Sequence, residues 1–298
     1  MRVYWFVIFL LFGCTSQNDM EDSKQLNDWD REGWDIVWQD EFDGASLDIN
    51  KWSHEVGGHG FGNNELQYYT DDSSNSFVDN GILHIRAKYE PAGIGSPNNL
   101  RNFSSARLRT VGKGDWQYGR IDVKAKIALG QGIWPAIWML PSDWIYGGWP
   151  KSGEIDIMEH VGHDEGRIHG SVHTESYNHI IGTQRTNSKL IENVKTLFHL
   201  YSIEWSEQKI DFFIDDTLHF TFKNDFTNDF RTWPFNERFH LLLNVAVGGN
   251  WPGPPNNTTV FPQDMEVDYV RVYEKQEKLS LIHISEPTRP ERISYSVL

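Results

Sequence analysis

The sequence has a single cysteine, Cys14, among 298 residues, so no disulfide can form within the chain. It is also short of basic residues, because 27 lysines and arginines stand against 42 aspartates and glutamates, for a net charge of -15. Nucleic-acid affinity depends on Lys and Arg side chains that neutralise phosphates, so this balance argues against nucleic acid as a partner. We interpret the acidic excess as charge that keeps an exported protein soluble.

Long hydrophobic runs are also missing, with one short exception at the N-terminus. In MRVYWFVIFLLFGC, residues 1–14, Arg2 precedes an apolar run that is too short to span a bilayer and suits the apolar part of a signal peptide. Cys14 follows a small residue, and this junction resembles a bacterial lipoprotein signal. We expect lipidation at Cys14 and a protein exported and lipid-anchored to the bacterial outer membrane, either periplasmic or at the cell surface. An ordinary cleaved signal with an incidental cysteine is the alternative.

Sustained helical periodicity with caps is scarce as well. Aromatic residues are abundant, with 13 Trp, 11 Tyr and 17 Phe, and short alternating runs follow one another between Gly, Asn, Asp and Pro. We expect strands at 35–42, 81–89, 105–111, 118–127, 168–175, 199–206, 209–216, 238–248 and 267–274. This spacing predicts an all-β fold, a jelly-roll sandwich of two curved antiparallel sheets with a concave substrate cleft.

The chain divides into four segments. After the signal and its cysteine at 1–14, the polar residues 15–28 form a flexible tether, and the jelly-roll domain takes residues 29–274, as an expected monomer. Residues 275–298 neither extend the last strand nor carry turn chemistry toward another. Their stretch LSLIHISEPTRP resembles translated sequencing-adapter DNA, so we expect a non-native or disordered tail.

Three carboxylates stand within six residues in the segment GEIDIMEH, at Glu154, Asp156 and Glu159. The flanking glycines and the short window favour a strand over a helix. In a regular strand Glu154 and Asp156 share one face, whereas Glu159 points to the other. A β-bulge at Ile157 and Met158 returns Glu159 to the first face and bends the strand. The sequence therefore predicts a bulge that gathers all three carboxylates on one concave surface.

Paired carboxylates in a groove suit glycoside hydrolysis, in which one carboxylic acid protonates the leaving oxygen and a second carboxylate attacks the sugar or activates water. The bulge brings the separation of about 5 to 5.5 Å, typical of retaining enzymes, within reach. A plain surface strand is the alternative, but it gives no reason to place like charges together. A catalytic metal held with His160, His163, His169 and His173 is a further alternative, which the lack of an H-E-x-x-H pair disfavours.

The E-x-D-x-x-E spacing of GEIDIMEH resembles glycoside hydrolase family 16, in particular the laminarinase-like β-1,3-glucanases. Further ordered matches cover most of residues 34–273: WQDEFDG at 38–44, GNNELQYYT at 62–70, SARLRT at 105–110, GQGIWPAIWMLP at 130–141, NVAVGGNWPG at 244–253 and MEVDYVRVY at 265–273. The resemblance implies a retaining double displacement with Glu154 as nucleophile and Glu159 as acid/base. It also implies that the charge of Asp156 keeps Glu159 protonated and that a hydrogen bond positions Glu154.

The substrate implied by the resemblance is a β-glucan polysaccharide, cleaved by an endo-acting β-1,3-glucanase of the laminarinase type. Three alternatives stay open on the same fold: a mixed-linkage β-1,3-1,4-glucanase, an agar-type galactanase, and a glycan-binding jelly roll without catalysis. Lichenase-type members have a tighter E-x-D-x-E spacing than the one in this chain. The presence of all three carboxylates favours an enzyme over a binding protein.

Four tryptophans are candidates for sugar binding. Trp134 and Trp138 fall on one face of a predicted strand with Ala136 between them, and two flat indoles there would stack on sugar rings. Core packing is the alternative for both. Trp149 and Trp251 lie on Gly- and Pro-rich loops, where we expect them at the rim of the cleft.

Two polar residues, Asn64 and Arg109, match family positions that contact sugar hydroxyls, and His173 is a similar candidate. Turn or surface roles are the alternatives for Asn64 and Arg109, whereas His173 lies on a strand that we expect to border the cleft.

No cofactor is expected for catalysis, but the resemblance implies one structural ion. Relatives often carry calcium on the convex face, and the matching oxygen ligands here are the Glu41 and Asp268 side chains and the Gly81 carbonyl. Such an ion would stabilise the fold and take no part in the chemistry.

Overall fold

The computed structural model describes residues 30–276. The signal segment, Cys14, the tether and the tail from residue 277 onward lie outside the described residues, so the predictions for them stay predictions. Within the described part, β-strand pairing continues to Lys275, and the Gln276 amide donates to the carbonyl of Gly33. The strand region therefore runs slightly past the expected end at 274. Among residues 30–276, no helix has the length and apolar character needed to cross a bilayer.

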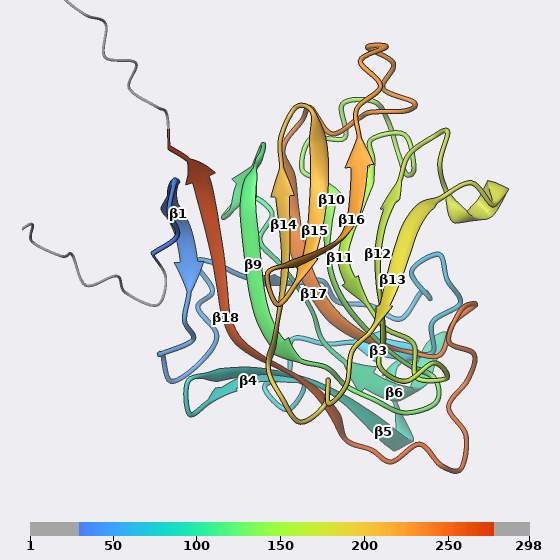
Figure 1. The fold of residues 1–298 in the computed structure, drawn as a ribbon. Helices are drawn as coiled ribbons and strands as arrows, with labels where there is room; N and C mark the ends of the chain where they lie inside the picture. The colour runs from blue at the N-terminus through green and yellow to red at the C-terminus, as the bar shows by residue number, and fades with distance from the viewer. Residues whose placement is uncertain (1–29, 277–298) are drawn as a thin grey trace, which may run out of the picture.

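Two sheets make up the fold, as the sequence predicts (Figure 1). The first contains β1 (Trp34–Asp40), β3 (Gln67–Tyr69), β4 (Ser76–Asp79), β5 (Ile82–Ser96), β6 (Asn99–Ser105), β9 (Gly119–Lys126), β14 (His199–Trp205), β15 (Lys209–Ile214), β16 (Thr217–Lys223) and β18 (Gln263–Lys275). The second contains β2 (Ser53–His54), β7 (Arg107–Arg109), β8 (Asp115–Trp116), β10 (Ile133–Pro141), β11 (Glu154–Glu159), β12 (Arg167–His173), β13 (Arg185–Leu190) and β17 (Phe239–Val247). A single turn of 3-10 helix, η1 (His179–Ile181), joins β12 to β13.

Strand order places the functional strands near the middle of the second sheet. That sheet runs β13, β12, β11, β10, β17, β7 and β2, with β8 beside β17. The first sheet runs β16, β15, β14, β9, β18, β5, β6 and β3, with β1 beside β18 and β4 beside β5. Neighbouring strands within residues 30–276 pair antiparallel, except that β3 and β6 pair parallel. The expectation of two antiparallel sheets therefore holds apart from this one pair.

Every predicted run contains an observed strand, but some strands and boundaries were missed. The strand predicted at 209–216 includes Asp215 and Asp216, whereas both have positive φ, at 50° and 54°, and form the two-residue turn between β15 and β16. Such a turn matches the twist of a hairpin. The edge strand β13 was missed because its sequence RTNSKL is mostly exposed and polar and carries no apolar alternation.

The apolar core lies between the sheets, and β17 shows how the sequence builds it. All nine of its residues are buried. Leu241, Leu243 and Val245 point into the core, while Asn244 and Ala246 on the opposite face line a cleft. Because β17 lies between β10 and β7, its outer face forms part of the cleft floor instead of contacting bulk solvent. This explains why an apolar strand carries one asparagine.

Candidate active site

Strand β11 contains the predicted bulge. Asp156 and Glu159 are three positions apart, but their partners in β12, Ser171 and His169, are only two apart. The extra residue falls within 157–158, where the register with β10 also shifts. The bulge is therefore confirmed at the place that the carboxylate spacing predicted.

The bulge places the carboxylates in the cleft and the apolar residues between them in the core. Glu154, Asp156 and Glu159 all line one cavity on the concave face. Ile157 and Met158 have no exposed surface and belong to the core cluster. Glu159 would lie on the wrong face of a regular strand, and the two-for-one pairing corrects this.

Burial changes the protonation chemistry of all three carboxyls. It raises the pKa of Asp156 to about 8 and that of Glu159 to about 8, and it raises the pKa of Glu154 well above its ordinary value. The negative charge of Asp156 raises the pKa of Glu154 and of Glu159 further. The family resemblance implies that the charge of Asp156 keeps Glu159 protonated, and this charge does raise the pKa of Glu159, but burial is the larger cause. Because the three groups interact, they titrate as a unit that holds protons near neutral pH.

Two indoles orient the two glutamates. The Nε1 group of Trp149 donates to Glu154 Oε2 over 2.9 Å, and the Nε1 group of Trp134 donates to Glu159 Oε1 over 3.0 Å. The sequence predicted both tryptophans near the cleft, but as stacking or rim residues. Their hydrogen bonds hold each carboxylate in a fixed orientation, which a stacking surface alone would not do.

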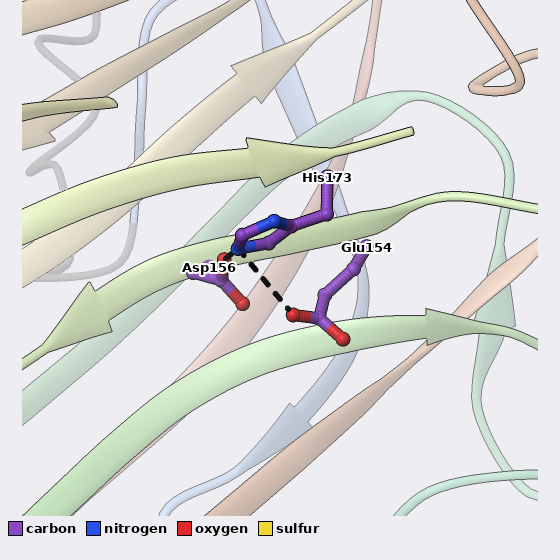
Figure 2. Close-up of side chains that lie close together, drawn as sticks. All are labelled: Glu154, Asp156 and His173. Carbon is purple, nitrogen blue, oxygen red and sulfur yellow. Dashed lines mark ion pairs between the residues drawn. The ribbon is translucent and has the colours of Figure 1, made fainter. Parts of the chain in front are cut away.

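His173 completes the cluster from the neighbouring strand β12, as Figure 2 shows. Its Nε2 atom lies 3.3 Å from Asp156 Oδ2 and 3.8 Å from Glu154 Oε1. The residue is 5% exposed, and the cleft reaches it from the side of β12 and β13. The prediction that His173 borders the cleft is therefore confirmed, and the residue lies closer to the acids than its sequence position indicated.

The cleft floor beside β11 is aromatic. Trp134 and Trp138 both line it with Ala136 between them, as predicted. The Arg107 guanidinium lies over the Trp138 ring, 4.7 Å from its centroid. Trp251 is 38% exposed and meets Trp134 edge to face at 5.6 Å, which is the rim position that its loop indicated.

Two predicted sugar-contact residues lie beside the cleft lining instead of in it. Asn64 is exposed, has a φ of 56°, and donates to Asn250 Oδ1, while its neighbour Asn63 lines the cleft. Arg109 lies 3.7 Å from Glu55, while Arg107 of the same strand lines the cleft. Both motifs therefore lie at the cleft. In GNNELQYYT the side chain that lines it is one residue before the predicted one, and in SARLRT it is two residues before.

A buried polar chain beneath Trp138 was missed by the sequence analysis. Trp138 Nε1 donates to Asn244 Oδ1 at 2.7 Å, and Asn244 Nδ2 donates to the Tyr69 hydroxyl at 3.0 Å. The Tyr69 hydroxyl donates to Glu65 Oε2 at 3.2 Å, which also accepts from Gln67. Burial raises the pKa of Glu65. The only sequence signal was polar residues within otherwise apolar runs, in NVAVGG and ELQYYT.

One end of the cleft is bounded by two loops. Trp149, from the β10–β11 loop, lies 5.2 Å from His179 of η1 between their ring centroids. In Figure 1, η1 projects from the molecule beyond β12 and β13. Asn178 caps this turn by accepting from the Ile181 amide, and its side chain also donates to two backbone carbonyls of the same loop. The loop is therefore held by its own hydrogen bonds against the Glu154 end of the cluster.

The predicted calcium ligands have other partners. Both carboxylate oxygens of Glu41 accept from Arg271, at 2.7 Å each, and Asp268 Oδ2 lies 2.9 Å from Lys124 Nζ. Gly81 takes a φ of 77° in the turn before β5. In this conformation a calcium ion would have to displace two cationic side chains, so the donor set does not fit the ion as it stands. The structural calcium stays a prediction.

Comparisons with known proteins agree with this geometry. The family described as glycosyl hydrolases family 16 matches residues 63–271. The beta-glucanase of Rhodothermus marinus is 45% identical over 282 residues, which cover 92% of this chain and 94% of that protein. The X-ray structure of the laminarinase from Rhodothermus marinus has a TM-score of 0.77 and 46% identity, covering 82% of this chain and 98% of that chain. SCLam, a non-specific endo-beta-1,3(4)-glucanase, has a TM-score of 0.76 and 41% identity, covering 83% and 93%.

Proposed function

The chain belongs to family 16 of the glycosyl hydrolases, and from this membership we infer that it is an endo-acting β-1,3-glucanase that cleaves laminarin-like polymer with retention. The observation that carries the mechanism is the bulge in β11, which places Glu154, Asp156 and Glu159 on one cleft floor. An acid cluster of this kind, held by indole donors in an open groove, suits cleavage inside a long sugar polymer.

In the first step we assign Glu154 as the nucleophile. Its carboxylate attacks the anomeric carbon, while Glu159 gives its proton to the glycosidic oxygen, so that the C–O bond breaks and a glycosyl ester forms. In the second step Glu159 takes a proton from water, the water oxygen attacks the same carbon, and Glu154 leaves as a carboxylate. Two inversions at one carbon give net retention.

The surroundings of Glu159 suit a proton donor, whereas those of Glu154 act on its charge in both directions. Glu159 has a pKa raised to about 8, so it holds a proton to donate at neutral pH. At Glu154, burial and the charge of Asp156 raise the pKa well above its ordinary value, whereas the neighbouring His173 and the Trp149 hydrogen bond at Oε2 favour the ionised carboxylate that a nucleophile requires. Asp156 lies between them and its charge raises the pKa of both, so the choice of nucleophile and acid/base follows the family resemblance.

The floor beyond the carboxylates supports a glucan substrate. Trp134, Trp138 and the rim residue Trp251 offer aromatic surfaces to sugar rings, and Asn63 and Arg107 offer donors to hydroxyl groups. Mixed-linkage glucan is a second candidate substrate because the similar protein SCLam carries a 1,3(4) description. A purely glycan-binding role would not require the hydrogen bonds that orient both glutamates.

We also propose that the enzyme is exported and lipid-anchored through Cys14, which supports action on polymer outside the cytoplasm. The short apolar run before the only cysteine of the chain supports this proposal. Metabolic labelling with a palmitate analogue tests it: we expect label on the full chain and none on Cys14→Ala.

The test of function is a product profile on laminarin, curdlan, lichenan and agarose with the same enzyme preparation. We expect internal cleavage of laminarin and curdlan and no release of sugar from agarose. Proton NMR of the first-formed product is expected to show the β-anomer, because retention preserves the configuration. An initial α-anomer, or binding of laminarin without new reducing ends, would overturn the mechanism.

A further inference from the structure

Glu154, Asp156 and His173 each direct one atom that could bind a metal ion toward the same small space. His173 Nε2 lies 3.3 Å from Asp156 Oδ2 and 3.8 Å from Glu154 Oε1, and one ligand atom from each residue lies within 4.8 Å of the others. Figure 2 shows the imidazole edge directed between the two carboxylates. Across residues 30–276 this is the one group of three or more acidic, His or Cys side chains with such spacing.

Within residues 30–276, the ion-pair contacts of these three ligand atoms are with one another. The Asp156 side chain is 3% exposed, and its Oδ2 atom has no hydrogen-bond partner among the described residues. Trp149 donates to the other oxygen of Glu154, Oε2, and leaves Oε1 toward the histidine. A buried carboxylate oxygen without a donor is costly, so this atom is poised to accept a cation.

The spacing selects a class of cation. Zinc bonds of 2.0 to 2.1 Å in a tetrahedron place neighbouring ligand atoms about 3.3 to 3.4 Å apart. The nitrogen to Asp156 distance already has this value, the Glu154 contact needs to shorten by about half an ångström, and the Asp156 and Glu154 ligand atoms lie within 4.8 Å of each other. Calcium and magnesium prefer six or more oxygen ligands and discriminate against an imidazole nitrogen. One imidazole and two carboxylates therefore fit zinc, with the fourth position open to the cleft.

We propose that Glu154, Asp156 and His173 form a binding site for one Zn²⁺ ion, and that this ion excludes the glucan by occupying the nucleophile. The binding claim stands on the geometry alone, whereas the inhibitory consequence rests on the proposed function. His173 Nδ1 is buried without a hydrogen-bond acceptor among residues 30–276, so in this part of the chain the ring lacks the outer partner that strengthens most zinc-bound histidines. We therefore expect a reversible site that chelators empty and that competes with substrate.

The test is calorimetric titration of ZnCl₂ into the full chain in a non-chelating buffer. We expect one ion per chain, with affinity at least about tenfold lower in each of Glu154→Gln, Asp156→Asn and His173→Gln. The matched control is His199→Gln, because His199 Nδ1 pairs with a single carboxylate, Asp215, at 2.8 Å on the other sheet. This control is expected to bind zinc as the unchanged protein does. Co²⁺ used as a probe should show the visible bands of four-coordinate geometry.

Competition on the unchanged protein keeps the test independent of variant folding. A saturating β-1,3-gluco-oligosaccharide is expected to abolish the zinc heat, and zinc is expected to raise the apparent KM with kcat unchanged until EDTA restores it. Zinc binding that persists in all three ligand variants, or that ignores the oligosaccharide, would overturn the site. A third outcome separates the two claims. If zinc binds through these three residues and the zinc-loaded enzyme is still fully active, the zinc site stands and the proposed role of Glu154 as nucleophile is overturned.

Discussion

Asp122 and Asp156 are both buried acids on central strands, but their surroundings differ in charge. Asp122, on β9 of the first sheet, accepts from Arg31 Nε at 2.6 Å and from Arg120 Nε at 2.7 Å. Asp156, on β11 of the second sheet, has two glutamates and one histidine for neighbours and no arginine or lysine contact within the described residues. Both side chains are at most 3% exposed, so burial is matched and charge compensation is the variable.

This difference separates a structural acid from a functional one. Burying a charge is costly unless a partner of opposite sign accompanies it, and the first sheet follows that rule. The second sheet breaks it at the point where three acids meet a cleft. The uncompensated charge raises the pKa values of its neighbours, which is what an acid catalyst near neutral pH requires. The electrostatically unfavourable region is therefore the one we assign to catalysis.

The largest effect is expected from Glu154→Gln. The amide keeps the shape and the Trp149 contact region but cannot attack the anomeric carbon, so kcat on laminarin should fall by about 10³-fold or more. Steady-state kinetics with oligosaccharide binding measured in parallel checks this, and binding should be largely retained. A variant that keeps a tenth of the activity would remove the nucleophile assignment.

Glu159→Gln is expected to follow, with a loss of about 10²- to 10⁴-fold, because it removes the general acid. The loss should shrink on an aryl glycoside whose leaving group needs no proton, since the first step then proceeds unaided. Pre-steady-state measurement with that substrate should show a burst of released aryl group, as the second step still lacks its base. An equal loss on both substrates would argue against the acid/base role.

A paired test compares Asp122→Asn with Asp156→Asn in stability. Asp122→Asn leaves Arg120 and Arg31 with less compensation and should destabilise the protein by about 3 kcal/mol, with the cleft unchanged. Asp156→Asn should raise Tm, because it removes a buried acid that no arginine or lysine within residues 30–276 compensates. The pKa of Asp156 is about 8 in the folded protein and has its ordinary value of 3.8 in the unfolded chain, so the folded state binds the extra proton between these values. The stability of the unchanged protein therefore falls as pH rises from about 3.8 to about 8.

The Tm advantage of Asp156→Asn should therefore be larger at pH 8 than at pH 5, as thermal denaturation at both values would show. If instead the two variants lose stability equally, the contrast between the two sheets does not hold.

The smallest expected effect is a shift in the pH at which activity falls on the alkaline side of the pH profile. Activity should fall as pH rises past about 8, because Glu159 then loses the proton that it donates. In Asp156→Asn the neighbouring negative charge is gone, so the pKa of Glu159 drops and the alkaline limb of kcat/KM should move to lower pH by about one unit. A limb that stays in place would mean that burial alone sets this pKa.

The structure sharpened the sequence analysis most at the sugar-contact positions. Family motifs marked Asn64 and Arg109, whereas the cleft is lined by Asn63 and Arg107. A motif fixes a position along the chain to within a residue or two. Which side chain reaches the groove depends on the left-handed turn at Asn64 and on where β7 crosses the edge of the cleft floor, and both depend on neighbouring strands.

By itself the sequence determined the all-β sandwich, the bulge and the gathering of three carboxylates on one face. It could do so because strand alternation and its violation between Asp156 and Glu159 are local properties that spacing reveals. Only the tertiary structure decided that Trp134 and Trp149 donate to the two glutamates, that His173 joins the cluster, and that no arginine or lysine within residues 30–276 pairs with Asp156. These features depend on which distant strands and loops surround β11, and electrostatic energies in a buried site are set by those surroundings.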